Sequence, residues 1–171
     1  MLRLTNVCFV AGWLALIMVT PAEAQDPEVS AESGIVDAHW KEVLRPIAHQ
    51  GMQVSGYPEL RVGIVELRGR ILITGVDVGT LAAWVTYALN GQIIRYQGYV
   101  HYRYADGSAA LAAMSAKGQV PGMQQGSLTF IEGTGQFEGI EGTMTLSTST
   151  INPAEGINTA EAIGRYSLPH R

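Results

Sequence analysis

The clearest pattern in the chain is an alternation of apolar and polar residues, strongest between residues 126 and 149. Leu128 and Phe130 alternate with serine and threonine, and Met144 and Leu146 repeat the pattern further on. A period of two is typical of strands that bury one face. The segment between these two strands is rich in glycine, which allows close backbone approach and positive φ. The pattern therefore predicts two strands joined by a fixed corner, as found in a barrel or a sandwich.

The same alternation extends over most of the chain. Residues 80–90 form a clean strand that ends at Asn90-Gly91, a strong hairpin signal, and residues 92–104 form its partner. Asp106-Gly107 then turns the chain into an alanine-rich strand over residues 108–116, whose small side chains leave room inside a barrel. Three further strands are predicted over residues 60–67, 71–78 and 160–168. We therefore expect an all-β fold, an antiparallel eight-stranded calycin-like barrel.

A different periodicity precedes the barrel. Ser33 could cap a helix in which apolar residues recur at helical spacing, namely Val36, Trp40, Val43 and Ile47. The sequence therefore predicts a short N-terminal amphipathic helix. Such a helix could pack on the domain, plug one end of the barrel or lie on a membrane surface.

The first 24 residues have the features of a secretory signal. Arg3 supplies a positive charge, residues 7–20 are almost entirely apolar, and Ala22-Glu23-Ala24 matches a signal-peptidase site. The apolar run is shorter than the roughly 20 residues that span a bilayer. We expect cleavage after Ala24, no stable membrane anchor afterwards, and a periplasmic or extracellular protein. The predicted organisation is a signal over residues 1–24, a polar leader with the helix over 25–59, and the barrel domain over 60–171.

Composition excludes several classes of function. The only cysteine, Cys8, lies in the predicted signal, so the mature chain has no disulfide and no cysteine-based metal site. A net charge of −4 gives no basis for binding nucleic acid. The sequence also has no nucleotide-binding glycine loop, HExxH motif or nucleophile elbow. We therefore expect no cofactor and no metal site.

The glycine-rich corner also carries a family resemblance. Residues 133–142, GTGQFEGIEG, resemble the G-T-G-x-F-x-G-x-x-G corner of the allene oxide cyclase-like barrels, a superfamily that includes the plant dirigent proteins. Members usually have a further glycine where this chain has Glu132. The resemblance is best between Tyr99 and Leu146. It implies a barrel that binds a reactive, mostly apolar small molecule and steers its cyclisation or coupling without a cofactor.

The strand over residues 92–104 holds the main candidate site. Tyr99, His101 and Arg103 alternate along it and therefore point the same way. If they face the interior, His101 could act as an acid or base and Arg103 could hold a carboxylate or an enolate. The opposite face, with Val100, is more apolar and is the better core candidate. Glu132, at the end of a strand near the predicted rim, completes the candidate catalytic set.

Two classes of function remain open. The first is a cofactor-independent cyclase or isomerase, and the second is a non-catalytic, lipocalin-like protein that binds an apolar small molecule. A polar lumen that contains His101 and Arg103 would favour the enzyme, whereas a uniformly apolar lumen would favour the binding protein. The sequence leaves open the identity of the ligand and whether the protein forms a homo-oligomer.

Overall fold

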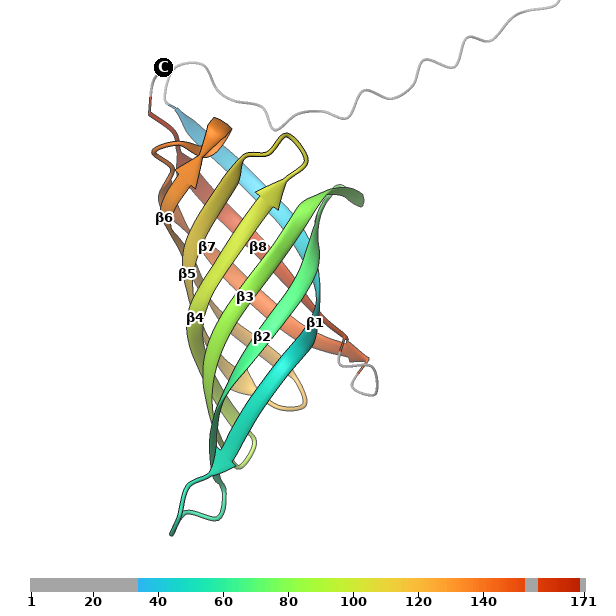
Figure 1. The fold of residues 1–171 in the computed structure, drawn as a ribbon, viewed down its shortest axis with the longest axis vertical. Helices are drawn as coiled ribbons and strands as arrows, with labels where there is room; N and C mark the ends of the chain where they lie inside the picture. Colours follow the sequence, from blue (N-terminus) through green and yellow to red (C-terminus); the bar gives the residue numbers. More distant parts are fainter. Residues whose placement is uncertain (1–33, 153–156, 170–171) are drawn as a thin grey trace, which may run out of the picture.

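The protein is a closed antiparallel barrel in a computed structural model that describes residues 34–152 and 157–169. Each strand pairs with its neighbours in sequence, and β8 pairs with β1 to close the ring (Figure 1). The strands are β1 (Ile35–Gln53), β2 (Leu60–Ile73), β3 (Val76–Asn90), β4 (Ile93–Tyr104), β5 (Ala109–Gln119), β6 (Met123–Thr134), β7 (Glu141–Asn152) and β8 (Ile157–Ser167). The predicted eight-stranded antiparallel barrel is confirmed.

The alternation of side chains explains how the barrel is filled. In β3, Leu81, Ala83 and Val85 are buried, whereas Trp84 and Thr86 between them are exposed. Successive side chains of a strand point to opposite faces of the sheet, so one apolar row of each strand fills the lumen. The predicted hairpin between β3 and β4 also forms, with Asn90 paired to Ile93 across a two-residue turn.

The expected N-terminal helix is wrong. Residues 35–53 form β1, which pairs with β8 through residues 35–44 and with β2 through residues 41–53. Val36 and Trp40 are four residues apart, a spacing that suits a strand face as well as a helix face. Val43 and Ile47, also assigned to the apolar helix face, are 37% and 53% exposed on the outside. The barrel therefore starts at β1, inside the segment assigned to the leader and helix, and not at residue 60.

Two further boundaries concern the start of the chain and β2. The predicted signal over residues 1–24 lies outside the residues that the structure describes. β2 is one continuous strand through residues 68–70, where two separate strands were expected, and the turn falls at Thr74-Gly75.

Within residues 34–152 and 157–169, no helix is long and apolar enough to cross a membrane.

One end of the lumen is closed by the glycine-rich corner. A short 3-10 helix, η1 (Gly135–Phe137), follows β6, and Gly135 and Gly139 adopt φ values of +62° and +74°. Phe137 is buried there, with its ring centroid 4.6 Å from that of Tyr104 and 6.1 Å from that of Tyr166. The corner is thus a packed structure, as its apolar anchors predicted, and its aromatic ring fills this end of the barrel.

The opposite end of the barrel is more open. There the hairpin of β1 and β2 projects beyond the other strands, at the bottom of Figure 1. β1 pairs with β8 only as far as Leu44 and continues to Gln53 beside β2. A β-bulge between Pro46 and Ala48 shifts the register and turns His49 toward the lumen. The candidate site extends toward this end.

Candidate functional site in the barrel lumen

A buried glutamate projects into the lumen from β1. Trp40, Glu42 and Leu44 lie on alternate positions and therefore share the inward face of this strand. Glu42 is only 3% exposed, and it is the one buried ionisable carboxyl in the described parts of the chain. Burying a charge is costly unless partners compensate for the lost water, so such a residue calls for an explanation.

The carboxyl of Glu42 is held through one of its two oxygens. Oε1 accepts a hydrogen bond from Trp40 Nε1 at 3.0 Å and another from Tyr102 Oη at 2.7 Å. The rings of Trp40 and Tyr102 also meet edge to face, with centroids 5.6 Å apart. Among residues 34–152 and 157–169, no partner forms a hydrogen bond with Oε2. Every fully buried side-chain oxygen or nitrogen in these residues does have a partner, so Oε2 is not fully buried. Oε2 therefore borders open space in the lumen.

Burial changes the acid–base properties of this group. Loss of water raises the pKa of the Glu42 carboxyl above its ordinary value of 4.5, and the hydrogen bonds from Trp40 and Tyr102 offset only part of this rise. The pKa of the Tyr102 hydroxyl is also raised, by its own burial first and then by the nearby Glu42. Both changes favour the neutral forms. In its neutral form, Glu42 is a carboxylic acid with a proton to donate.

The open space beside Glu42 is a cavity of about 560 Å³. Its wall is mainly apolar and includes Leu44, Leu67, Val85 and Leu128. The cavity extends from Glu42 to residues at the strand ends near the open end of the barrel, such as Asn158. Its volume lies within the range of small-molecule sites, which combine an apolar wall with a few polar groups.

Polar side chains join opposite walls of this cavity. Tyr96 on β4 makes a 2.6 Å hydrogen bond to Thr148 on β7, and Thr148 donates a 2.7 Å hydrogen bond to Gln124 on β6. Nearer the open end, Tyr87 Oη and His49 Nε2 lie 2.7 Å apart, and their rings are stacked. All five side chains line the cavity.

A glycine makes room for the tyrosine at the open end. A Cβ at Gly63 would lie 2.7 Å from Cε1 of Tyr87, closer than a real Cβ approaches another carbon. Gly63 is paired with Tyr87 across β2 and β3. The absent side chain at residue 63 therefore makes room for the Tyr87 ring beside β2.

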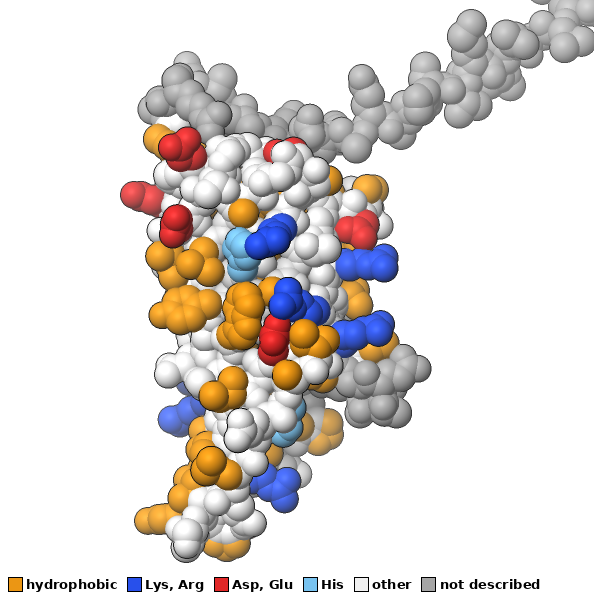
Figure 2. Space-filling view, in the orientation of Figure 1, with side chains coloured by type: hydrophobic (Ala, Val, Ile, Leu, Met, Phe, Trp, Pro, Cys, Tyr) orange, Lys and Arg blue, Asp and Glu red, His pale blue; other side chains and the backbone are white. Residues whose placement is uncertain are grey.

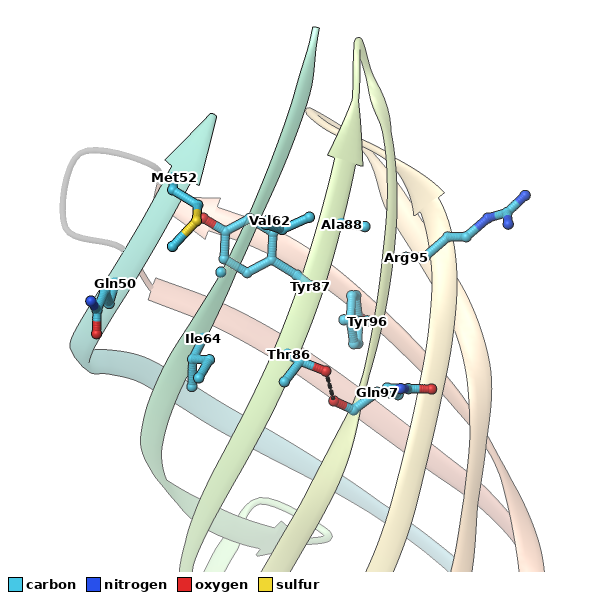
Figure 3. A pocket seen from close by; sticks show the side chains of 11 residues that line it. Gln50, Met52, Val62, Ile64, Thr86, Tyr87, Ala88, Arg95, Tyr96 and Gln97 are labelled. Atoms are coloured by element: carbon cyan, nitrogen blue, oxygen red, sulfur yellow. Dashed lines mark hydrogen bonds between the residues drawn. The ribbon is translucent and has the colours of Figure 1, made fainter. Parts of the chain in front are cut away.

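A second hollow lies on the outside of the barrel. Figure 3 shows this groove, with Met52, Val62 and Ile64 from β1 and β2, and with Thr86 and Gln97 on β3 and β4. The dashed line marks the hydrogen bond from Thr86 Oγ1 to the carbonyl of Gln97 at 3.2 Å. Its volume, about 570 Å³, matches that of the lumen cavity. Most of its side chains are exposed and it contains no buried carboxyl group, so the lumen is the stronger candidate.

The four residues predicted from the sequence lie elsewhere. Tyr99 is 54% exposed, Arg103 is exposed and His101 is partly buried, all on the outer face of β4. Glu132 is exposed on β6. Figure 2 shows the outer surface over β2 to β5, where hydrophobic, basic and histidine side chains are mixed. Because the more apolar row of β4 faces inward, these four side chains do not line the cavity, and a role for them in the lumen has no geometric basis.

The inward row of β4 supplies functional groups that sequence reasoning assigned only to the core. Tyr96 and Tyr102 both come from this row. Glu42 was missed because its segment was assigned to a helix. The signal that could have found it is a carboxylate between Trp40 and Leu44 at a period of two, since a lone acid in an apolar strand row is unusual.

The site contains no evident position for a metal ion. Over the described part of the chain, no three His, Cys, Asp or Glu side chains are arranged to hold one. The ionisable side chains that line the lumen cavity are Glu42, His49, Tyr87 and Tyr96.

The fold of the barrel resembles that of solved dirigent proteins. The pterocarpan synthase dirigent protein PsPTS1 has a similar structure, with a TM-score of 0.54 at 12% sequence identity over 80% of this chain and 97% of that one. A second such protein, GePTS1, gives a TM-score of 0.49 at 14% identity over 88% and 99% of the two chains. No protein-family model matches the sequence, and no curated protein does so. The chain thus has the dirigent-like barrel fold that its glycine corner indicated.

Proposed function

We propose that the lumen binds an apolar small molecule, and that Glu42 exchanges a proton with it during a cyclisation or isomerisation that needs no cofactor. One observation carries this proposal: a buried carboxyl has one oxygen fixed by two donors and the other bordering an apolar cavity. A group held in this way is positioned for general acid–base catalysis. The same fold in a pterocarpan synthase makes a small-molecule reaction reasonable to test.

The proposed step balances without an oxidant or a reductant. Neutral Glu42 donates the proton on Oε2 to an oxygen of the ligand, which promotes rearrangement of the adjacent bonds. The carboxylate that results then takes a proton from the rearranged molecule, so the product is an isomer of the substrate. Trp40 and Tyr102 hold Oε1 throughout and stabilise the carboxylate while it carries charge.

The alternative is a lipocalin-like binding protein without catalysis. It is favoured by the rest of the cavity wall, which is apolar and offers burial rather than chemistry. In either case we propose that the protein acts in the periplasm or outside the cell. The support for this location is the predicted signal over residues 1–24, and N-terminal sequencing of exported protein would test cleavage after Ala24.

Native mass spectrometry of the protein purified from its own host tests the proposal first, because it identifies any small molecule that co-purifies. Wild type, Glu42→Gln and Glu132→Gln are then compared for binding and conversion of that molecule. Gln keeps the shape of Glu42 but has no acidic proton, so we expect conversion to fall at least about a hundredfold with binding retained.

The Glu132 variant is the matched control, because it makes the same change on the outer surface. It should behave as wild type. Binding without conversion by the wild-type protein would support the lipocalin-like alternative. Equal conversion by wild type and Glu42→Gln would contradict the role of Glu42.

A further inference from the structure

A chain of hydrogen bonds crosses the lumen and ends on the backbone. It begins at Tyr96 on β4, passes through Thr148 on β7 and reaches Gln124 on β6. Gln124 Nε2 then donates to the carbonyl oxygens of Gln119 and Gly122, each at 2.7 Å. Gln124 is only 8% exposed, so this end of the chain is fixed inside the protein.

The two carbonyl groups determine the direction of every hydrogen bond in the chain. A carbonyl oxygen can only accept, so both N–H groups of Gln124 are used on Gln119 and Gly122. Gln124 Oε1 must then accept, and Thr148 donates to it. Thr148 has a single hydroxyl proton, so in its own bond to Tyr96 it must accept. The hydroxyl proton of Tyr96 is therefore committed to Thr148.

We propose that Tyr96 and Thr148 form an acceptor-only site, which selects ligands that bring a hydrogen-bond donor such as a hydroxyl group. Both side chains line the cavity, and only their oxygen lone pairs remain unused. A ligand that offers only acceptors would leave these lone pairs without a partner after losing its water, which weakens binding. This inference rests on the proposed function, since it concerns the same cavity.

The site is complementary to the one at Glu42. In its neutral form, Glu42 offers a proton from Oε2 to an acceptor, whereas Tyr96 and Thr148 bind a donor. Both positions belong to one cavity. The ligand class is therefore an apolar molecule that carries a hydroxyl group and, at a separate position, an oxygen acceptor.

Three fluorescent naphthalene probes separate these requirements. 2-Naphthalenemethanol has a donor and an acceptor, its methyl ether has only the acceptor, and 2-ethylnaphthalene has neither. We expect the wild-type protein to bind the alcohol about threefold to tenfold more tightly than the ether, which is the range of one ordinary hydrogen bond. Tyr96→Phe should lower this ratio, because it removes one of the two acceptors and leaves only the oxygen of Thr148.

Thr148→Val provides a sharper test because it keeps the Tyr96 hydroxyl group but removes the acceptor to which that hydroxyl donates. With no acceptor at residue 148, the hydroxyl proton of Tyr96 becomes free to donate into the cavity. The ether should then bind a few times more tightly than it does to wild type, and the preference for the alcohol should disappear. Tyr99→Phe is the matched control on the outer face of β4, and it should keep the wild-type ratio. Thermal unfolding of each variant checks that it is folded.

The outcomes distinguish this inference from the proposed function. Equal binding of alcohol and ether to wild type would overturn the acceptor-only site while leaving the cavity in place. An unchanged ratio in folded Tyr96→Phe or Thr148→Val would also overturn it. If none of the three probes binds to wild type, the lumen is not a ligand site, and the proposed function fails together with this inference.

Discussion

The two ends of the lumen are built from the same strands but are filled differently. At the closed end, rings from the corner and the strands meet, with Phe137 against Tyr104 and Tyr166. Toward the open end, a cavity of about 560 Å³ remains between the inward side chains. Packed aromatic side chains bury large areas and favour stability, whereas an unfilled lumen leaves room for a ligand. One end of the lumen is thus packed, and the other contains the cavity.

Glu42 lies where these two regions meet. Trp40, one of its donors, also packs near Phe130, whose ring centroid is 6.4 Å away in the packed region. Oε2 faces the cavity on the other side. The packed end therefore provides the rigid support, and the cavity provides access, for the same carboxyl group.

The largest effect should come from emptying the closed end. Phe137→Ala should lower the free energy of unfolding by about 3–5 kcal/mol, because it removes a buried ring and leaves a void. Tyr87→Ala, at the cavity end, should cost less because that ring already borders open space. Urea denaturation measures both. A larger loss for Tyr87→Ala would contradict the distinction between the ends.

The corner should be sensitive to side chains at positive φ. Gly139→Val should cost about 1–2 kcal/mol from backbone strain alone, and its Cβ would also lie 2.7 Å from Cγ of Pro169. Gly75→Val is the matched control, because its φ is +86° but no atom lies within 4 Å of the added Cβ. The Gly139 variant should therefore have the lower melting temperature. Equal melting temperatures would show that the corner does not pack against Pro169.

The stability of the protein should depend on pH through Glu42. Its pKa is raised in the folded state, so the folded protein holds this proton more tightly than the unfolded chain does. Relative to Glu42→Gln, wild type should be most stable below pH 4.5, the ordinary glutamate value, and should lose stability as pH rises through the folded pKa. Denaturant titrations of both proteins at several pH values measure this difference. If the stability of wild type relative to Glu42→Gln instead increased with pH, the pKa of Glu42 would not be raised by folding.

The smallest effects should come from the outer face of β4. His101→Ala and Arg103→Ala should each change the free energy of unfolding by less than about 0.5 kcal/mol, because both side chains lie on the outside. Neither should alter the affinity for 2-naphthalenemethanol. Loss of probe binding in either folded variant would mean that the outer face, and not the lumen, carries the site.

The barrel could be predicted because the sequence patterns that indicate its strands and turns are local. Alternation in β3 and β4, the turn after Asn90 and the corner around Phe137 each depend on residues close together in the sequence. β1 was misassigned because Val36 and Trp40, four residues apart, fit a helix face as well as a strand face. β1 pairs with β2, which follows it, and with β8, more than 100 residues away, and this pairing on both sides makes it a strand.

The site was less predictable than the fold. Tyr99, His101 and Arg103 were chosen because they concentrate polar chemistry on one face, but burial favoured the opposite row of β4. The environment of Glu42 depends on Tyr102, 60 residues away, and on a cavity formed by several strands. Neither the hydrogen bonds nor the cavity follows from a local pattern.

The most direct test of the account is the state of the Glu42 carboxyl group in solution. Carbon-13 NMR of protein labelled at the glutamate side-chain carboxyl, with Glu42→Gln for assignment, follows its titration with and without 2-naphthalenemethanol. We predict that the pKa of Glu42 lies above 4.5, the ordinary glutamate value, and that its resonance shifts when the probe binds. A Glu42 carboxyl whose pKa is not raised above 4.5, and whose resonance does not respond to bound probe, would contradict the proposal that the lumen is the functional site.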